Sequence, residues 1–226
     1  MGDAPTTPNP VDLERLWDRV CRSLGAGDDE SIGRAWFVVD AMYHHPPRAY
    51  HNLDHIMACL RLVDPNDLPD PSIAEPTDRI RFAIFLHDCV YDSRRPDNEA
   101  RSAGIAAMLA RDLGLPAATI EAGRRLIMAT THKGEPADHL EAIIRDVDLA
   151  SLAAEPAVFD ANTRAIRQEY AWASDEKWRA GRAAFFRDML ARPRIYFTLA
   201  FQDRFERAAR ENLRRALNGL ERSHDQ

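Results

Sequence analysis

A histidine and an aspartate stand side by side at positions 87 and 88, directly after an apolar run. The run, residues 81–86, reads RFAIFL, so this segment is expected to lie in the interior of the protein. A buried imidazole or carboxylate is costly unless it is neutralised or bound to a partner. Because imidazole nitrogen and carboxylate oxygen together suit a borderline or hard divalent cation, the pattern indicates that His87 and Asp88 bind a metal ion.

Two further segments carry residues of the same chemical types. His51 and His55 are four residues apart at the start of an expected helix, so their side chains would project from nearly the same side. Asp146 and Asp148 flank Val147 near the end of another expected helix and must face different directions. Each histidine could instead cap or pack, and each aspartate could close a helix. Separate structural roles nevertheless explain poorly why such residues recur on three apolar helices.

The elements that must position these residues are all helices. Apolar residues recur with helical spacing, capping residues punctuate the chain, and no alternating β-branched run occurs, so an all-α fold with eight or nine helices is predicted. Residues 64–76, with four prolines, are expected to form a surface loop. Helices are expected after Asn9-Pro10, Asp28, Asn52, the 64–76 loop, Asp97 or Asn98, Pro116 and Pro136. Three more are expected over residues 157–173, 174–191 and 195–220, with capping signals at Asp160 or earlier, at Ser174 and, at the end of the last helix, at Gly219.

Composition narrows the class of protein. The chain has 226 residues, of which 45% are hydrophobic and 29% charged, as is typical of a soluble globular protein with one core. We expect a disordered N-terminus over residues 1–10 and a single domain over residues 11–222. The three cysteines are scattered and flanked by apolar residues, which favours reduced core residues over disulfides.

Charge and hydropathy indicate which partners the protein has. The formal net charge is −6 and no basic tract occurs, which disfavours long nucleic acid but leaves room for a small phosphorylated ligand. No apolar run approaches the roughly 20 residues of a membrane span, and the N-terminus lacks the features of a signal peptide. We therefore expect a cytoplasmic protein without membrane partners.

The order of the candidate ligands resembles a known superfamily. His55, then His87-Asp88, then Asp148 is similar to the H…HD…D hallmark of the HD superfamily of metal-dependent phosphohydrolases. The segment Tyr50-His51-Asn52 followed by His55 resembles the YHNxxH element of cyclic nucleotide phosphodiesterases in that superfamily. From about residue 17 to residue 217 the chain also resembles a bacterial subfamily of predicted HD phosphohydrolases, through RAYHNLDH, FLHDCVYD, DNEARSA, THK, DVDLASL and RIYF…FERAARENL.

The resemblance implies a helical bundle of the HD-domain type and a role for each matching residue. The metal ligands would be His55, His87, Asp88 and Asp148; Asp148 matches the last motif better than Asp146, although the choice between them stays open. The ion would be Mn²⁺, Mg²⁺, Fe or Zn²⁺. His51 matches the position that protonates the leaving oxygen, and Asp88 would also orient the attacking water.

One position departs from the phosphodiesterase pattern. Those enzymes have a further histidine four residues after the HD histidine, where this chain has Tyr91. Asp92, Glu99 and His132 are candidates for a second metal ion, although Glu99 is equally explained as a helix cap. Candidates for holding a substrate phosphate are His132, Lys133, Arg94 and Arg95, although the lysine and the two arginines are also readily explained as solvated surface charges.

Three functions are compatible with this pattern. The first is a phosphohydrolase that cleaves a phosphate ester or anhydride of a nucleotide or other small phosphorylated metabolite. The second is a catalytically weak sensor that binds a metal ion and a nucleotide. The third is a helical interaction protein whose acidic and histidine pairs are structural. The substrate, the number of metal ions and the oligomeric state stay open; the last helices could cover the core or pair in a homodimer.

Overall fold

The protein is described by a computed structural model that covers residues 10–45, 48–64 and 77–222. Within these residues the regular elements are ten α-helices and one short 3₁₀-helix, and there is no strand. The all-α prediction is therefore confirmed; the ten α-helices exceed the predicted total of eight or nine but match the ten places at which helices were expected. The predicted disordered N-terminus, except its last residue, and the predicted loop beyond residue 64 lie outside the described residues.

The chain divides into two compact units, residues 1–135 and 136–226. We call them the N-terminal and C-terminal units and describe each by itself. The single domain expected over residues 11–222 stays a prediction. Among the described helices, none combines the length and the apolar character that crossing a membrane would require.

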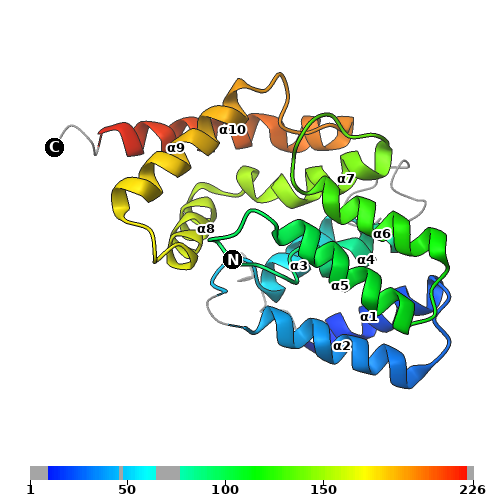
Figure 1. Cartoon of the computed structure of the whole chain (residues 1–226). Coiled ribbons are helices and arrows are strands. Elements are labelled where there is room, and N and C mark those ends of the chain that lie inside the picture. Colours follow the sequence, from blue (N-terminus) through cyan, green and yellow to red (C-terminus); the bar gives the residue numbers. More distant parts are fainter. Residues whose placement is uncertain (1–9, 46–47, 65–76, 223–226) are drawn as a thin grey trace, which may run out of the picture. The chain divides into compact units, whose positions relative to one another are not determined.

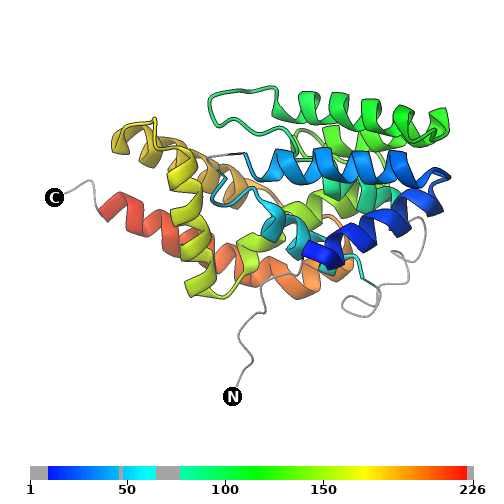
Figure 2. The ribbon, with the colours of Figure 1, turned by 90° about the horizontal axis from the view of Figure 1, so that it is seen from below.

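The N-terminal unit is built around one central helix. Its helices are α1 (Pro10–Ser23), α2 (Asp29–Tyr43), α3 (Leu53–Leu62), α4 (Thr77–Leu86), α5 (Asn98–Asp112) and α6 (Ala117–Ala129) (Figure 1). Helix α4 packs against α1, α3, α5 and α6, which explains why its second half is almost entirely apolar. Helices α5 and α6 lie side by side (Figures 1 and 2).

An aromatic cluster anchors α4 within this unit. The ring of Trp17 on α1 lies 5.6 Å from that of Phe82 and 5.3 Å from that of Phe85, and Trp36 on α2 lies 6.2 Å from Phe85. The indole Nε1 of Trp17 also donates a hydrogen bond of 3.3 Å to the carbonyl of Ile32. Large buried aromatic side chains contribute strongly to packing, so the end of α4 that leads into His87 is firmly held.

The C-terminal unit contains the remaining helices. They are α7 (His139–Leu149), η2 (Ala150–Ala153), α8 (Pro156–Glu169), α9 (Asp175–Ala191) and α10 (Leu199–Arg222). Helix α10 packs against η2 and α9, and the buried side chains of this unit include Phe159, Phe186, Tyr196, Phe201 and Leu213. The predicted cap at Ser174 is confirmed, because its side chain accepts a hydrogen bond from the backbone N–H of Lys177 at the start of α9.

Helix α10 differs from the sequence expectation at both ends. It begins at Leu199, after the apolar segment 195–198 that the helical pattern included. Backbone N–H groups of this segment donate instead to the carboxylates of Glu206 and Asp146, and these bonds hold it outside the helix. The capping signal predicted at Gly219 is wrong, because α10 continues through that residue to Arg222.

Candidate metal centre

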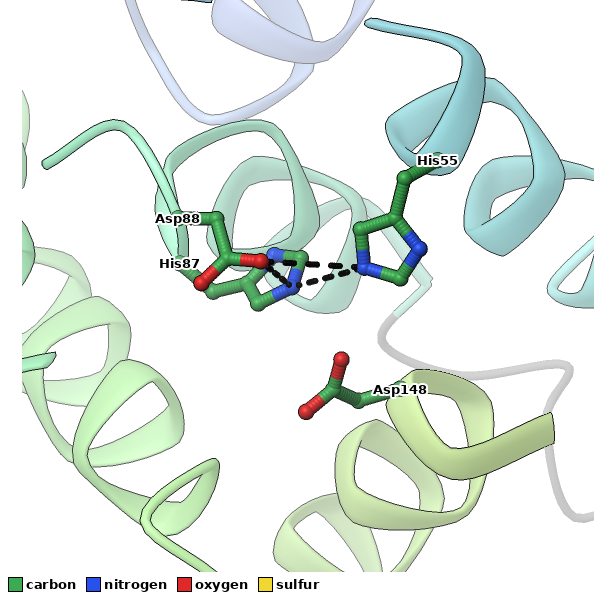
Figure 3. A group of neighbouring side chains, drawn as sticks. All are labelled: His55, His87, Asp88 and Asp148. Atoms are coloured by element: carbon green, nitrogen blue, oxygen red, sulfur yellow. Dashed lines mark hydrogen bonds and ion pairs between the residues drawn. The ribbon is translucent and has the colours of Figure 1, made fainter. Parts of the chain in front are cut away.

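Three atoms that could bind a metal ion converge in the N-terminal unit. Nε2 of His55 lies 3.4 Å from Nε2 of His87 and 3.7 Å from Oδ2 of Asp88, and the last two atoms are 3.2 Å apart (Figure 3). A divalent ion about 2.1 Å from each nitrogen or oxygen would hold neighbouring ligand atoms roughly 3.0–3.5 Å apart. Two of the three distances lie in this range and the third exceeds it by 0.2 Å, so the donor types and their spacing are close to those of a bound metal ion.

His55 owes its position to the N-terminus of α3. The side chain of Asn52 accepts hydrogen bonds from the backbone N–H groups of Asp54 and His55, at 2.9 and 3.3 Å, and so caps the helix as predicted. This cap places His55 in the first turn, where its side chain is buried. The thiol of Cys59, one turn further along, lies 3.8 Å from each nitrogen of the His55 ring.

His87 is oriented by the helix that it follows. Its Nδ1 lies 2.9 Å from the carbonyl oxygen of Ile84. Since a carbonyl only accepts hydrogen bonds, Nδ1 carries a proton, and in the neutral ring Nε2 therefore presents a lone pair to the site. The next two carbonyls of α4 are also satisfied: Phe85 accepts from the hydroxyl of Tyr43 at 3.0 Å, and Leu86 accepts from a backbone N–H at 3.2 Å.

An arginine connects the segments that carry the ligands. Nη1 of Arg48 donates to the carbonyls of His51 and Asp88, at 2.8 and 2.7 Å, and Nη2 donates to that of Cys89 at 2.8 Å. The guanidinium also lies 5.1 Å from the centroid of the Tyr43 ring. Arg48 is not among the site residues predicted from the sequence, because a side chain that binds backbone carbonyls leaves no pattern of residue types.

His51 lies beside the ligands but outside helix α3, which starts after it. Its ring centroid is 6.1 Å from that of His55; that the two side chains act at one point stays a prediction. The same ring stacks on Tyr91, with centroids 3.8 Å apart and planes inclined by 21°. Tyr50 approaches it edge-on at 4.9 Å. Two aromatic side chains thus hold the His51 ring.

The aspartates of α7 differ in their partners. The buried carboxylate of Asp146 accepts three hydrogen bonds of 2.7–2.8 Å, from the backbone of Phe197 and from the backbone and hydroxyl of Thr198. Burial raises its pKa to about 6, although these donors oppose the shift. Asp148 is half-buried and is the fourth residue, with the three ligands above, that could hold a metal ion (Figure 3).

The residues proposed for a second ion or a phosphate are not among these candidate ligands. Within the described residues the only such group consists of two histidines and two aspartates, without Asp92, Glu99 or His132. Asp92 is exposed, and its carboxylate accepts a hydrogen bond of 2.9 Å from the backbone N–H of Arg94. His132 lies in the turn after α6 with a φ of 55°. Lys133 is exposed beside it. Their roles stay predictions.

The group of residues that could hold a metal ion contains no cysteine. All three cysteines are free and buried, as the sequence indicated. Burial raises the pKa of the Cys21 and Cys89 thiols to about 12, so both are protonated at neutral pH. The donor atoms of the candidate group are nitrogen and oxygen.

No protein-family model matches the chain, and neither does any curated protein. The resemblance to the HD superfamily therefore rests on the motifs themselves.

Proposed function

We propose that the protein is a metal-dependent phosphohydrolase that cleaves a phosphate ester or anhydride of a nucleotide or another small phosphorylated metabolite. The observation that supports the proposal best is the convergence of two imidazole nitrogens and a carboxylate oxygen within 3.2–3.7 Å of one another. In this proposal His55, His87, Asp88 and Asp148 hold a divalent ion, either Mn²⁺, Mg²⁺, Fe or Zn²⁺.

The bound ion would supply Lewis-acid stabilisation of the phosphoryl oxygens and would activate a water molecule. Asp88 would orient the attacking water. His51 would protonate the departing oxygen, because its half-buried ring lies beside the ligands and imidazole exchanges a proton readily near neutral pH. The stack on Tyr91 would keep this ring in one orientation.

Metal content tests the proposal first. Untagged parent protein and the Asp88→Ala variant are analysed for metals, and phosphate release from a panel of nucleotides is then measured with added Mn²⁺. Asp54→Ala is the matched control, because it removes an exposed carboxylate next to His55 that is not a candidate ligand. We expect near-stoichiometric metal and phosphate release in the parent and the control, and neither in Asp88→Ala.

Two results would contradict the proposal. A parent protein that takes up no metal even with added Mn²⁺ would make the histidines and aspartates structural. Full activity in Asp88→Ala would exclude the mechanism. The same assays on Asp148→Ala and Asp146→Asn determine which aspartate of α7 is needed for metal binding.

A further inference from the structure

We infer that Arg48 is a positioning residue of the metal centre. It ties the turn that leads into α3, and hence to His55, to the backbone that carries Asp88. This inference rests on the proposed metal centre. It concerns the protein contacts, other than those with the ion, that position the candidate ligands. Arg48 itself lies outside the group of candidate ligands.

The hydrogen bonds of Arg48 join segments that are distant in the sequence. One bond closes the local turn onto His51, whereas the other two reach Asp88 and Cys89, which are 40 and 41 residues away. All three are 2.7–2.8 Å long. Hydrogen bonds from a charged donor are short and strong. The guanidinium therefore fixes the spacing between two backbone segments that carry candidate ligands.

The chemistry of this position requires arginine. A guanidinium presents several N–H donors in one plane, so it binds carbonyls of different segments at once, whereas a lysine ammonium acts as a single point on a flexible stem. The ring of Tyr43 packs against the Arg48 guanidinium, whose Cζ lies 5.1 Å from the centroid of the ring. Because the Tyr43 hydroxyl donates to the carbonyl of Phe85, this ring is itself attached to the end of α4.

We call Arg48 and its three carbonyl partners the Arg48 clamp. Two distances between candidate ligand atoms depend on it, because each joins an atom of one clamped segment to an atom of the other. His55 follows the turn that Arg48 holds, while His87 and Asp88 belong to the other segment, and their ligand atoms are 3.4 and 3.7 Å from Nε2 of His55. Without Arg48 the two segments could separate and the ligand atoms would lose their spacing. Removing groups that orient metal ligands typically weakens metal affinity about 10–100-fold.

Calorimetric titration with Mn²⁺ tests the inference without an activity assay. Metal-free parent, Arg48→Ala and Arg48→Lys are compared at a temperature at which circular dichroism shows each protein to be folded. Arg167→Ala is the matched control, because Arg167 likewise donates to two backbone carbonyls, those of Tyr170 and Ala173, but in the C-terminal unit. Both alanine variants lose an arginine that binds backbone carbonyls. Only Arg48→Ala loses one that binds the segments carrying the candidate ligands.

We expect the dissociation constant for Mn²⁺ to rise about 10–100-fold in Arg48→Ala, to rise less in Arg48→Lys, and to stay at the parent value in Arg167→Ala. Millimolar guanidinium should partly restore binding to Arg48→Ala, since it can occupy the vacated space. An unchanged dissociation constant in a folded Arg48→Ala would overturn the inference while leaving the proposed function intact; should this variant not fold, the same result in Arg48→Lys would overturn it. A parent that binds no Mn²⁺ would overturn both.

Discussion

The imidazole of His51 lies flat against the phenol ring of Tyr91, with 3.8 Å between the centroids. Tyr91 is the position at which the chain departs from the phosphodiesterase pattern, where a further histidine is found. In this protein its ring contacts the residue proposed as the acid. The departure therefore has a structural role that the sequence pattern did not suggest.

Replacing Tyr91 should slow hydrolysis without removing the metal. Aromatic stacking contributes about 0.5–1.5 kcal/mol beyond simple burial, so Tyr91→Leu should lower kcat about 2–10-fold through a less well oriented His51. Metal affinity should not change. Tyr91→Phe is the control, because it keeps the ring. The NMR signal of the His51 ring protons should move downfield in Tyr91→Leu only, since that variant loses the ring current; an unmoved signal would contradict the stack.

His51→Ala should separate catalysis from metal binding. If His51 donates a proton to the leaving oxygen, its removal should lower kcat about 10²–10⁴-fold while the metal content stays at the parent value. His139→Ala, which removes an exposed histidine from the first turn of α7, is the control. Loss of metal in His51→Ala would instead make this histidine a ligand.

Removing the cap of α3 should affect stability and the metal centre together. Asn52→Ala leaves the N–H groups of Asp54 and His55 without their acceptor, so the free energy of unfolding should fall by about 1 kcal/mol. Metal affinity should fall as well, because His55 lies in the affected turn. Asn52→Asp keeps an acceptor and should behave like the parent in urea unfolding. Equal stability of the alanine variant would show that the cap contributes nothing.

An ion pair in the C-terminal unit should make part of the stability depend on pH. Arg215 on α10 binds Asp160 on α8 through two hydrogen bonds, of 2.8 and 3.0 Å, and lowers the pKa of that carboxyl below its ordinary value of 3.8. The contribution is therefore present above the ordinary pKa and disappears as the pH falls through the lowered one.

The corresponding variant is Asp160→Asn. Both side chains are more than 40% exposed, so the loss near neutral pH should stay below about 1 kcal/mol. Urea unfolding at pH 7 and at pH 2.5 measures the difference between parent and variant. The difference in the free energy of unfolding between parent and variant should be smaller at pH 2.5 than at pH 7. A difference that grows on acidification would contradict this account.

Some residues of the candidate site could be predicted from the sequence, because their positions follow from local chemistry. His87 and Asp88 end a run that is too apolar to lie at the surface, and Asn52 is a side chain that caps a helix by a local rule. The segment before α10 was mispredicted because distant carboxylates, those of Asp146 and Glu206, bind its backbone. Such long-range bonds are not visible in local periodicity. The Arg48 clamp was not predicted for the same reason, because two of its hydrogen bonds reach residues that are 40 and 41 positions away.

The ring of His87 has two functions at once, since Nδ1 closes α4 at the carbonyl of Ile84 and Nε2 faces the candidate site. The helix therefore immobilises this imidazole whether or not an ion is present. Ordering a side chain on binding costs conformational entropy, and for His87 that ordering already belongs to folding. The candidate centre is therefore preorganised on the side of α4, so an arriving ion would meet a candidate ligand that needs no rearrangement.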